Sequence, residues 1–399
     1  MEYHMSMYKE VVLRLFKNKP FVWILEIHVE WKTYTYGSGS GEQVVINVHD
    51  QRFFKKIIWY GDIGMWESYF LWYFTTNNLE KLLTWFVTNG QHLPSFPESK
   101  VVSYAIDRWR IFSKILHALN KNTKSGSKKN ISKHYDISNN FYSLWLDPTM
   151  TYSSAFFDGE MSLQEAQENK YKKMCEKVNL QKWDHVLEIG TWWGWFSLYA
   201  VKHYWCKITT VTISQEQYDY AQQKIKQAWL EDSIELRLQD YRDITWIYDK
   251  IVSIEMMEAL GHEYVATYLE KCAEVLRPWG NMCVQCITMP DDHFQKYLSN
   301  QDYIKKHIFP WGELLSVGQI TSDAKKTETL EVTHVEYFGQ SYAKTLHLRL
   351  DNFMKVTQEL LDLWFDEEFM RKWEYYFVYC AVWFSTEYIN VAQIALAKK

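Results

Sequence analysis

The stretch HVLEIGTWWGWFSLYA, residues 185–200, decides the fold of this chain. An apolar run is followed by a turn with glycine at Gly190 and Gly194, and then by a helical pattern. Backbone can approach a ligand closely at glycine, and the first N–H groups of a helix are free to bind it. The stretch therefore predicts a strand, a ligand-binding turn and a helix. Two positions of this turn that favour small residues hold Trp192 and Trp195.

The same alternation continues downstream. Apolar runs at 206–214, 234–240, 248–256 and 281–289 are separated by helical patterns such as 216–228 and 263–276. Strands that alternate with helices predict an α/β fold with a doubly wound, mostly parallel sheet. Ligands of such sheets bind beyond the carboxyl ends of the strands.

Polar residues follow the second, third and fourth of these predicted strands. Thr212 and Gln217 lie where a ribose would bind, although Ser214 with Gln217 also fits ordinary helix capping. Asp240 and Tyr241 follow the third run, where an adenine would be met. The fourth run ends in IEMMEALGHEY, with Glu255 and Glu258 three residues apart. Carboxylates in an apolar run are unfavourable to bury without partners, so we expect at least one to have an assigned partner.

The chain divides into three predicted parts. Residues 1–119 form a small α+β domain, in which 32–50 contain two strands around a Gly/Ser turn and 78–87 and 105–119 are helical. Residues 120–134 are a lysine-rich linker, and 135–399 form the α/β domain. The linker lysines are either a solvated tether or a basic patch that faces anionic lipid headgroups.

Composition excludes several classes. The net charge of −5 and a pI near 6.2 do not favour nucleic acid as a partner. No run of about 18 apolar residues and no secretory signal are present, so we expect a cytoplasmic protein with reduced cysteines. Cys283 and Cys286 are interpreted as buried strand positions rather than metal ligands, and no metal site is predicted.

Tryptophan is more frequent than glycine, with 20 residues against 15. Trp229 follows a predicted helix where a glycine cap is usual, and Trp279 lies in the turn RPWGNM. A non-glycine residue with positive φ is disfavoured by roughly 1–2 kcal/mol. Tryptophan thus stands at positions where backbone geometry favours glycine.

Several motifs together resemble one family. The run HYDISNNFYSLWLDPTMTYSSAFF at 134–157, with VLEIGTWWGW, VTISQEQ, DYRD, SIEMMEALG and SYAKTL, is similar to the cyclopropane-fatty-acyl-phospholipid synthases. YGDIGMWESY at 60–69 is similar to the amino-terminal domain of their longer bacterial members. The resemblance implies a seven-stranded sheet of the class I S-adenosylmethionine methyltransferase type.

The resemblance also implies a set of site residues. The positions that contact S-adenosylmethionine in the family correspond to Tyr152, Ser153, Glu188, Gly190, Thr191, Gly194, Thr212, Gln217 and Tyr241. The strand pattern adds Asp240 to this cofactor-binding set. A bicarbonate site falls on Glu258, Ile287 and Tyr342. Ser154 and Gln285 stand where many members have cysteine and histidine, and Trp66, Trp192 and Trp195 stand where the family usually has glycine.

The implied reaction adds the donor's methyl group to the cis double bond of a membrane acyl chain, and bicarbonate then removes a proton as a cyclopropane ring closes. The implied partners are unsaturated phospholipids met by peripheral contact with the bilayer; a homodimer is compatible with the sequence, which does not specify oligomeric state.

Three alternatives remain. They are methyl or methylene transfer without ring closure, a tryptophan-rich variant that only binds lipid, and the disfavoured class of small-molecule or nucleic-acid methyltransferases. His134 and His262 could act as bases, but a structural, hydrogen-bonded histidine is favoured at each position.

Overall fold

The computed structural model describes residues 2–93, 139–299 and 312–399, which form two compact units. The first unit takes in residues 1–116, 301–308 and 357–386, and the second takes in 117–300, 309–356 and 387–399. The segment 357–386 thus groups with the N-terminal part of the chain, although the predicted α/β domain includes it. The predicted linker and the predicted helix at 105–119 lie outside the described residues.

The first unit contains a four-stranded sheet. Its elements are α1 (Glu2–Phe16), β1 (Val22–Val29), β2 (Lys32–Tyr36), β3 (Ser38–Val48), α2 (Arg52–Phe70), β4 (Phe74–Thr76), α3 (Leu79–Thr88), a 3₁₀ turn η1 (Gly90–His92), α14 (Thr357–Asp362) and α15 (Glu367–Ser385). The strand order is β2-β1-β3-β4, with β1 and β3 parallel. The two strands predicted at 32–50 are present, but β1 lies between them, so they do not form a hairpin. Gly37, with φ of 85°, turns the chain, whereas the residues from Ser38 onward already belong to β3.

Aromatic packing joins α15 to α2 and α3 within the first unit. The Trp66 side chain is 1% exposed and lies with its ring centroid 3.5 Å from that of Tyr375. Arg371 donates to the Tyr69 carbonyl and lies 3.8 Å from the Tyr69 ring centroid. Tryptophan at position 66, where the family usually has glycine, is therefore a packed core residue in this chain.

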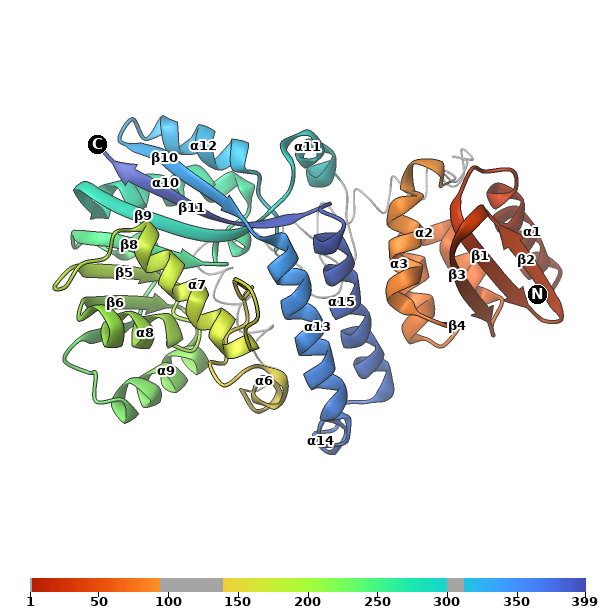
Figure 1. The fold of residues 1–399 in the computed structure, drawn as a ribbon, viewed down its shortest axis with the longest axis horizontal. Helices are drawn as coiled ribbons and strands as arrows, with labels where there is room; N and C mark the ends of the chain where they lie inside the picture. The colour runs from red at the N-terminus through yellow and green to blue at the C-terminus, as the bar shows by residue number, and fades with distance from the viewer. Residues whose placement is uncertain (1, 94–138, 300–311) are drawn as a thin grey trace. The chain divides into compact units, whose positions relative to one another are not determined.

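The second unit is built on a seven-stranded sheet (Figure 1). The strands are β5 (His185–Ile189), β6 (Lys207–Thr212), β7 (Ile234–Leu238), β8 (Tyr248–Ile254), β9 (Leu276–Thr288), β10 (Leu330–Tyr337) and β11 (Asn390–Lys398). Their order is β10-β11-β9-β8-β5-β6-β7, and β11 alone runs antiparallel to its neighbours. The predicted doubly wound, mostly parallel α/β fold is confirmed. Chain order reverses between β5 and β8, which is where such sheets bind ligands.

Helices cover both faces of this sheet. The helical elements of the second unit are α6 (Asn139–Trp145), α7 (Leu163–Lys177), α8 (Trp195–Tyr204), α9 (Gln215–Gln227), η2 (Tyr241–Asp243), η3 (Met257–Ala259), η4 (His262–Tyr264), α10 (Val265–Val275), α11 (Asp291–Ser299), α12 (Val317–Lys326) and α13 (Gly339–Lys355). Leu187 packs into the core shared with α10 and α12, and its neighbour Val186 packs into the core shared with α7, α8 and α9. Successive strand residues point to opposite faces, so a continuous apolar strand such as β5 requires cover on both sides.

Left-handed backbone is found at many tryptophans. Among the described residues eight tryptophans have positive φ, including Trp229 at 57° and Trp279 at 62°. The prediction for these two positions is confirmed. The Ser214 side chain accepts from the Gln217 N–H, which confirms its role as a helix cap. Cys283 and Cys286 are fully buried in β9, as the sequence predicts.

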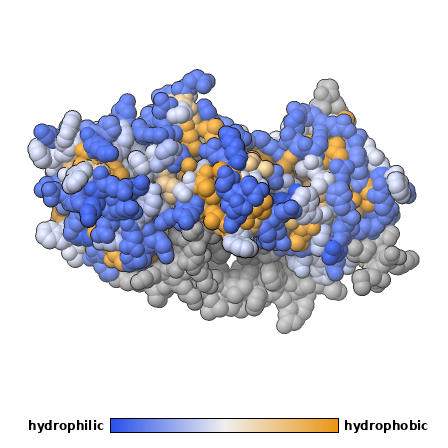
Figure 2. Space-filling view, turned by 90° about the horizontal axis from the view of Figure 1, so that it is seen from below, coloured by the Kyte–Doolittle hydropathy of each residue, from blue (hydrophilic) through white to orange (hydrophobic). Residues whose placement is uncertain are grey.

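No helix in the described part of the chain is both long and apolar enough to cross a membrane. The surface in Figure 2 is mainly hydrophilic, with apolar patches between polar side chains.

Candidate active site

The turn between β5 and α8 has the backbone that its glycines predict. Gly190 and Gly194 have φ of 97° and 87°, and the Gly190 and Thr191 N–H groups both donate to the Val211 carbonyl at 3.1 Å. Trp192 lies between the glycines with φ of 51°. The turn is thus tied to the adjacent strand β6, and its shape is set before any ligand binds.

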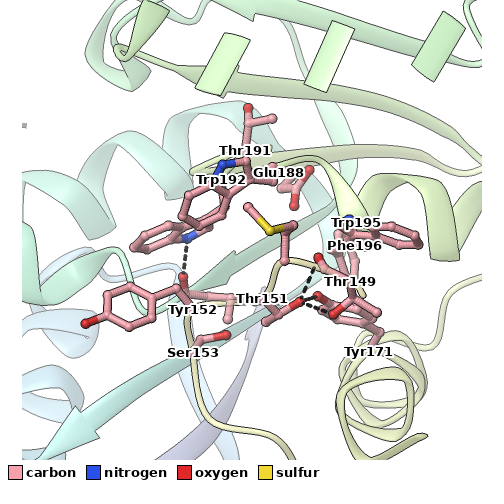
Figure 3. A pocket seen from close by; sticks show the side chains of 13 residues that line it. Thr149, Thr151, Tyr152, Ser153, Tyr171, Glu188, Thr191, Trp192, Trp195 and Phe196 are labelled. Atoms are coloured by element: carbon pink, nitrogen blue, oxygen red, sulfur yellow. Dashed lines mark hydrogen bonds between the residues drawn. The ribbon is translucent and has the colours of Figure 1, made fainter. Parts of the chain in front are cut away.

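A small pocket opens at this turn. Its cavity measures about 20 Å³, which is room for about one water molecule; pockets for drug-sized ligands measure roughly 300–1,000 Å³. The Trp192 indole N–H donates to the Ile254 carbonyl at 2.9 Å, which joins the turn to the end of β8. Trp192 lies on the side of Tyr152 and Ser153, whereas Trp195 lies on the side of Thr149 and Tyr171 (Figure 3). Indole rings therefore take up much of the space beside the turn.

Glu188 is the buried acid of this pocket. Its carboxylate accepts from the Ser197 hydroxyl at 2.5 Å, and its side chain is 3% exposed. Burial raises the pKa of Glu188 to about 7, and the hydrogen bond from Ser197 opposes that shift.

The segment 149–153 lines the opposite wall of the pocket, and two buried basic residues donate hydrogen bonds to atoms of its last three residues. Arg349 of α13 donates to the Thr151 carbonyl at 2.7 Å and to the Ser153 carbonyl at 2.6 Å. Lys170 of α7 donates to the Ser153 hydroxyl at 2.7 Å. Burial lowers the pKa of Lys170 to about 7, and the negative charge of Glu255 opposes that shift.

The ends of β6 and β7 lie outside this pocket. The Thr212 hydroxyl donates to the Gln217 side-chain oxygen at 2.8 Å, so this pair is already joined. The Asp240 carboxylate accepts from the Arg242 guanidinium at 2.6 and 2.8 Å and from the Arg242 N–H at 2.9 Å. The Tyr241 ring packs edge-on against that of Tyr268, with centroids 5.3 Å apart.

A carboxylate cluster lies at the end of β8. Glu255 Oε1 accepts from the Ser154 N–H and from the Gln285 amide, both at 2.8 Å. Glu255 Oε2 accepts from the Tyr342 hydroxyl at 3.0 Å. Gln285 is oriented in turn, because its side-chain oxygen accepts from the Gln393 amide at 3.1 Å. Three segments that are distant in sequence thus converge on the Glu255 side chain.

Glu258 has a different environment. Its Oε1 accepts from the Ile287 N–H at 2.6 Å, and its Oε2 is buried with no hydrogen-bond partner among the described residues. Burial, and then the charge of Glu255, raise the pKa of Glu258 to about 8. The Glu258 carboxyl is therefore mostly protonated at neutral pH.

Three comparisons with known proteins address the family. Residues 122–394 match the mycolic acid cyclopropane synthetase family. The chain is 34% identical over 285 residues to a tuberculostearic acid methyltransferase of Mycobacterium tuberculosis, a match that covers 69% of this chain and 66% of that protein, just under two thirds of its length. It is 30% identical over 353 residues to the cyclopropane-fatty-acyl-phospholipid synthase of Escherichia coli (strain K12), covering 88% and 87% of the two chains.

The chain belongs to the mycolic acid cyclopropane synthetase family. The crystal structure of a mycolic acid cyclopropane synthase complexed with SAH and CTAB matches 68% of this chain and 98% of that one, with a TM-score of 0.63 and 30% identity. As a member of this family the chain is an S-adenosylmethionine-dependent lipid methyltransferase by class, as the sequence predicts.

The structure brings part of the predicted synthetase-family site together. Tyr152, Ser153, Glu188 and Thr191 line the pocket. Ser154, Gln285 and Tyr342 meet at Glu255, a residue that the sequence marks only as one of two carboxylates. Of the predicted bicarbonate-site residues, the Ile287 N–H donates to Glu258, whereas the Tyr342 hydroxyl donates to Glu255.

Sequence reasoning missed Lys170 and Arg349. Both are buried among apolar helix positions, and the only signal is a basic residue on the apolar face of α7 or α13. His262 Nδ1 lies 2.6 Å from a Glu313 carboxylate oxygen, as expected of a structural histidine. His134 lies outside the described residues.

The two implied ligands fit this site differently. For the sulfonium donor the backbone of the β5 turn is suited, but the Trp192 indole must leave its position, with loss of its hydrogen bond to Ile254. For bicarbonate the side chains do not fit, because the Ser154, Gln285 and Tyr342 donors are all engaged by the Glu255 carboxylate.

Proposed function

We propose that the chain transfers the methyl group of S-adenosylmethionine to the cis double bond of a phospholipid acyl chain and closes a cyclopropane ring. The observation that supports this most is the Glu255 cluster, a half-buried carboxylate at the end of β8 beside the β5 turn. The match to the E. coli synthase over 88% of the chain points to the same chemistry.

The reaction requires a site that tolerates positive charge. Attack of the double bond on the methyl carbon breaks the carbon–sulfur bond and leaves a carbocation on the acyl chain. A fixed carboxylate in a site that excludes water stabilises such a charge more than it would in bulk solvent. Tyr342 and Gln285 hold Glu255 in place, and the ring of Tyr152 supplies part of the apolar surroundings.

A close alternative is methyl or methylene transfer without ring closure. The similarity to a tuberculostearic acid methyltransferase favours this alternative. In addition, Gln285 cannot change charge as a histidine could, so the environment of the group that removes the proton differs. In ring closure the added methyl group loses a proton and its carbon bonds to the cationic carbon. In methylene formation a hydride first moves from the methylated carbon to the cationic carbon, and the methyl group then loses its proton to form the double bond.

Lipid analysis tests the proposal. Cells that express the chain, or its Trp192→Gly variant, are expected to accumulate acyl chains heavier by one CH₂ group that resist mild hydrogenation. Products of that mass that still take up hydrogen support methylene transfer instead. Unchanged acyl chains with both proteins, despite measured donor binding, would reject both reactions and favour a scaffold that only binds lipid.

The partners follow from the substrate. We propose peripheral contact with the bilayer by a cytoplasmic protein, since the acyl chain must be drawn from a membrane. Flotation with vesicles of unsaturated anionic phospholipid tests this contact, and failure to float would contradict it. A homodimer stays a prediction.

A further inference from the structure

The hydrogen bonds around Glu255 form a complete anion site. Three donors from different segments point at its two oxygens, namely the Ser154 N–H, the Gln285 amide and the Tyr342 hydroxyl. Ser154, Gln285 and Tyr342 are themselves buried, with side chains at most 6% exposed. An anion bound from solution would need the same donors, so the carboxylate and such an anion exclude one another.

The backbone at Glu255 is unusual. Its φ is 47°, a conformation that L-residues other than Asn and Asp rarely adopt and that favours glycine. Strained residues persist where their surroundings determine them, and they cluster at functional sites. The three hydrogen bonds to the Glu255 carboxylate are contacts of that kind, and a glycine at this position would make none of them.

Glu255 is also placed to meet a substrate. It directly follows Ile254, whose side chain lines the pocket and whose carbonyl accepts from Trp192. Its carboxylate binds the N–H of the residue after Ser153, which lines the opposite wall. Both side chains are half-buried, and only the Oε2 atom of Glu258 is enclosed without a hydrogen-bond partner among the described residues.

Neighbouring charges distinguish the two carboxyl groups. Lys170 and Arg349 are buried basic residues that hold the segment 151–153 beside the cluster. Glu258 keeps its proton because of burial and of the Glu255 charge.

We propose that Glu255 takes the place of an external anion and is the catalytic base of this chain. The inference rests on the proposed function. When the double bond has taken the methyl group and the thioether has left with the carbon–sulfur electron pair, Glu255 accepts a proton from that methyl group. The C–H electron pair then forms the second ring bond, and the carboxyl group returns its proton to solvent.

Binding of carbon-13-labelled bicarbonate tests whether the site is taken. By NMR line broadening, the unaltered protein is expected to show no saturable binding. Glu255→Gly should show saturable bicarbonate binding, because the variant frees the three donors. Glu255→Gln should show none, because the amide fills the same space as the carboxylate. Glu328→Gly is the matched control, since Glu328 is an exposed glutamate with φ of 60° away from the cluster. Equal bicarbonate binding by the unaltered protein and Glu255→Gly would overturn the proposal.

Turnover tests the role as base. With Trp192→Gly as parent, vesicles of unsaturated phospholipid and bicarbonate-free buffer, the parent and its Glu328→Gly derivative should form product at equal rates. We expect Glu255→Gln to lose activity by about 100-fold or more, and Glu255→Gly to lose it similarly but to recover on addition of bicarbonate.

The outcomes separate the two proposals. A parent that requires bicarbonate, or a Glu255→Gln variant with full activity, contradicts the role of Glu255 as base. No lipid product from any variant, with or without bicarbonate, rejects the proposed function; the binding pattern then decides alone whether Glu255 fills the anion site.

Discussion

Trp192 and Glu255 both have a left-handed backbone conformation, but their side chains make different contacts. Both follow a parallel strand of the second unit, and both have positive φ, at 51° and 47°. The Trp192 indole makes one hydrogen bond, to Ile254, and fills the space beside the turn. The Glu255 carboxylate accepts three hydrogen bonds, from the Ser154 N–H, the Gln285 amide and the Tyr342 hydroxyl.

The difference lies in what surrounds each side chain. A large group at a glycine-type position reduces binding where the surroundings are shaped for a ligand. It adds chemistry where buried donors converge on the side chain, because a buried donor that loses its acceptor is unfavourable by about 1–3 kcal/mol. At two positions with the same left-handed backbone, the Trp192 side chain thus obstructs the donor site, whereas the Glu255 side chain occupies the anion site.

The largest effect is expected at the β5 turn. Trp192→Gly should increase the affinity for S-adenosylmethionine by about 100-fold or more, roughly 3 kcal/mol, because the donor no longer has to displace the indole. Calorimetric titration of both proteins measures this change. Trp205→Gly is the control, since Trp205 ends α8 with φ of 53° but is exposed. Equal affinities of the parent and Trp192→Gly would show that the indole does not obstruct the donor site.

A second effect concerns the pH dependence of folding stability, to which Glu258 should contribute. The unfolded chain loses the Glu258 proton near the ordinary pKa of about 4.5, whereas the folded chain keeps it to about 8. Folding stability from this group is therefore present at low pH and falls as pH rises through that window. Between pH 6 and pH 8 the unaltered protein should lose about 2 kcal/mol of its free energy of unfolding because of Glu258. Glu258→Gln should not show this loss, which urea unfolding at both pH values measures. Glu328→Gln controls for the change of charge, and an unaltered pH dependence in Glu258→Gln would contradict the assigned protonation.

The smallest effect concerns tryptophans outside the site. Trp229 follows α9 with φ of 57° and is 88% exposed. Trp229→Gly should raise the free energy of unfolding by about 1 kcal/mol, since strain is relieved and little packing is lost. Trp246→Gly, at an exposed position without positive φ, should lower it slightly because glycine adds disorder to the unfolded chain. Equal changes in the two variants would show that backbone strain at tryptophan is unimportant here.

Most of the fold could be predicted from sequence because strand and helix periods are local. The runs at 185–190 and 248–256 contain β5 and β8, and Ser214 begins α9 with its cap. Pairing across the first sheet could not be predicted, because β1 inserts between β2 and β3 through contacts that no local pattern encodes. The grouping of α15 with α2 and α3 likewise depends on long-range packing of aromatic rings.

The site was predicted in part for the same reason. Residues at strand ends, such as Glu188 and Glu255, are found by position, but which donors reach them is decided by the tertiary fold. Tyr342 reaches Glu255 rather than Glu258 because Glu255 extends from a left-handed backbone that its residue type does not suggest. Buried bases such as Lys170 look like ordinary helix residues until the helix is packed.

Helix α13 touches both halves of the site from one face. The Tyr342 hydroxyl donates to Glu255, the Thr345 hydroxyl accepts from the Ala155 N–H, and Arg349 donates to the carbonyls of Thr151 and Ser153. These three residues recur every three or four positions, so a single rigid rod fixes the alignment of proton acceptor and donor loop. Any sliding or rotation of that helix would shift both together, so a change in its register would keep their relative position.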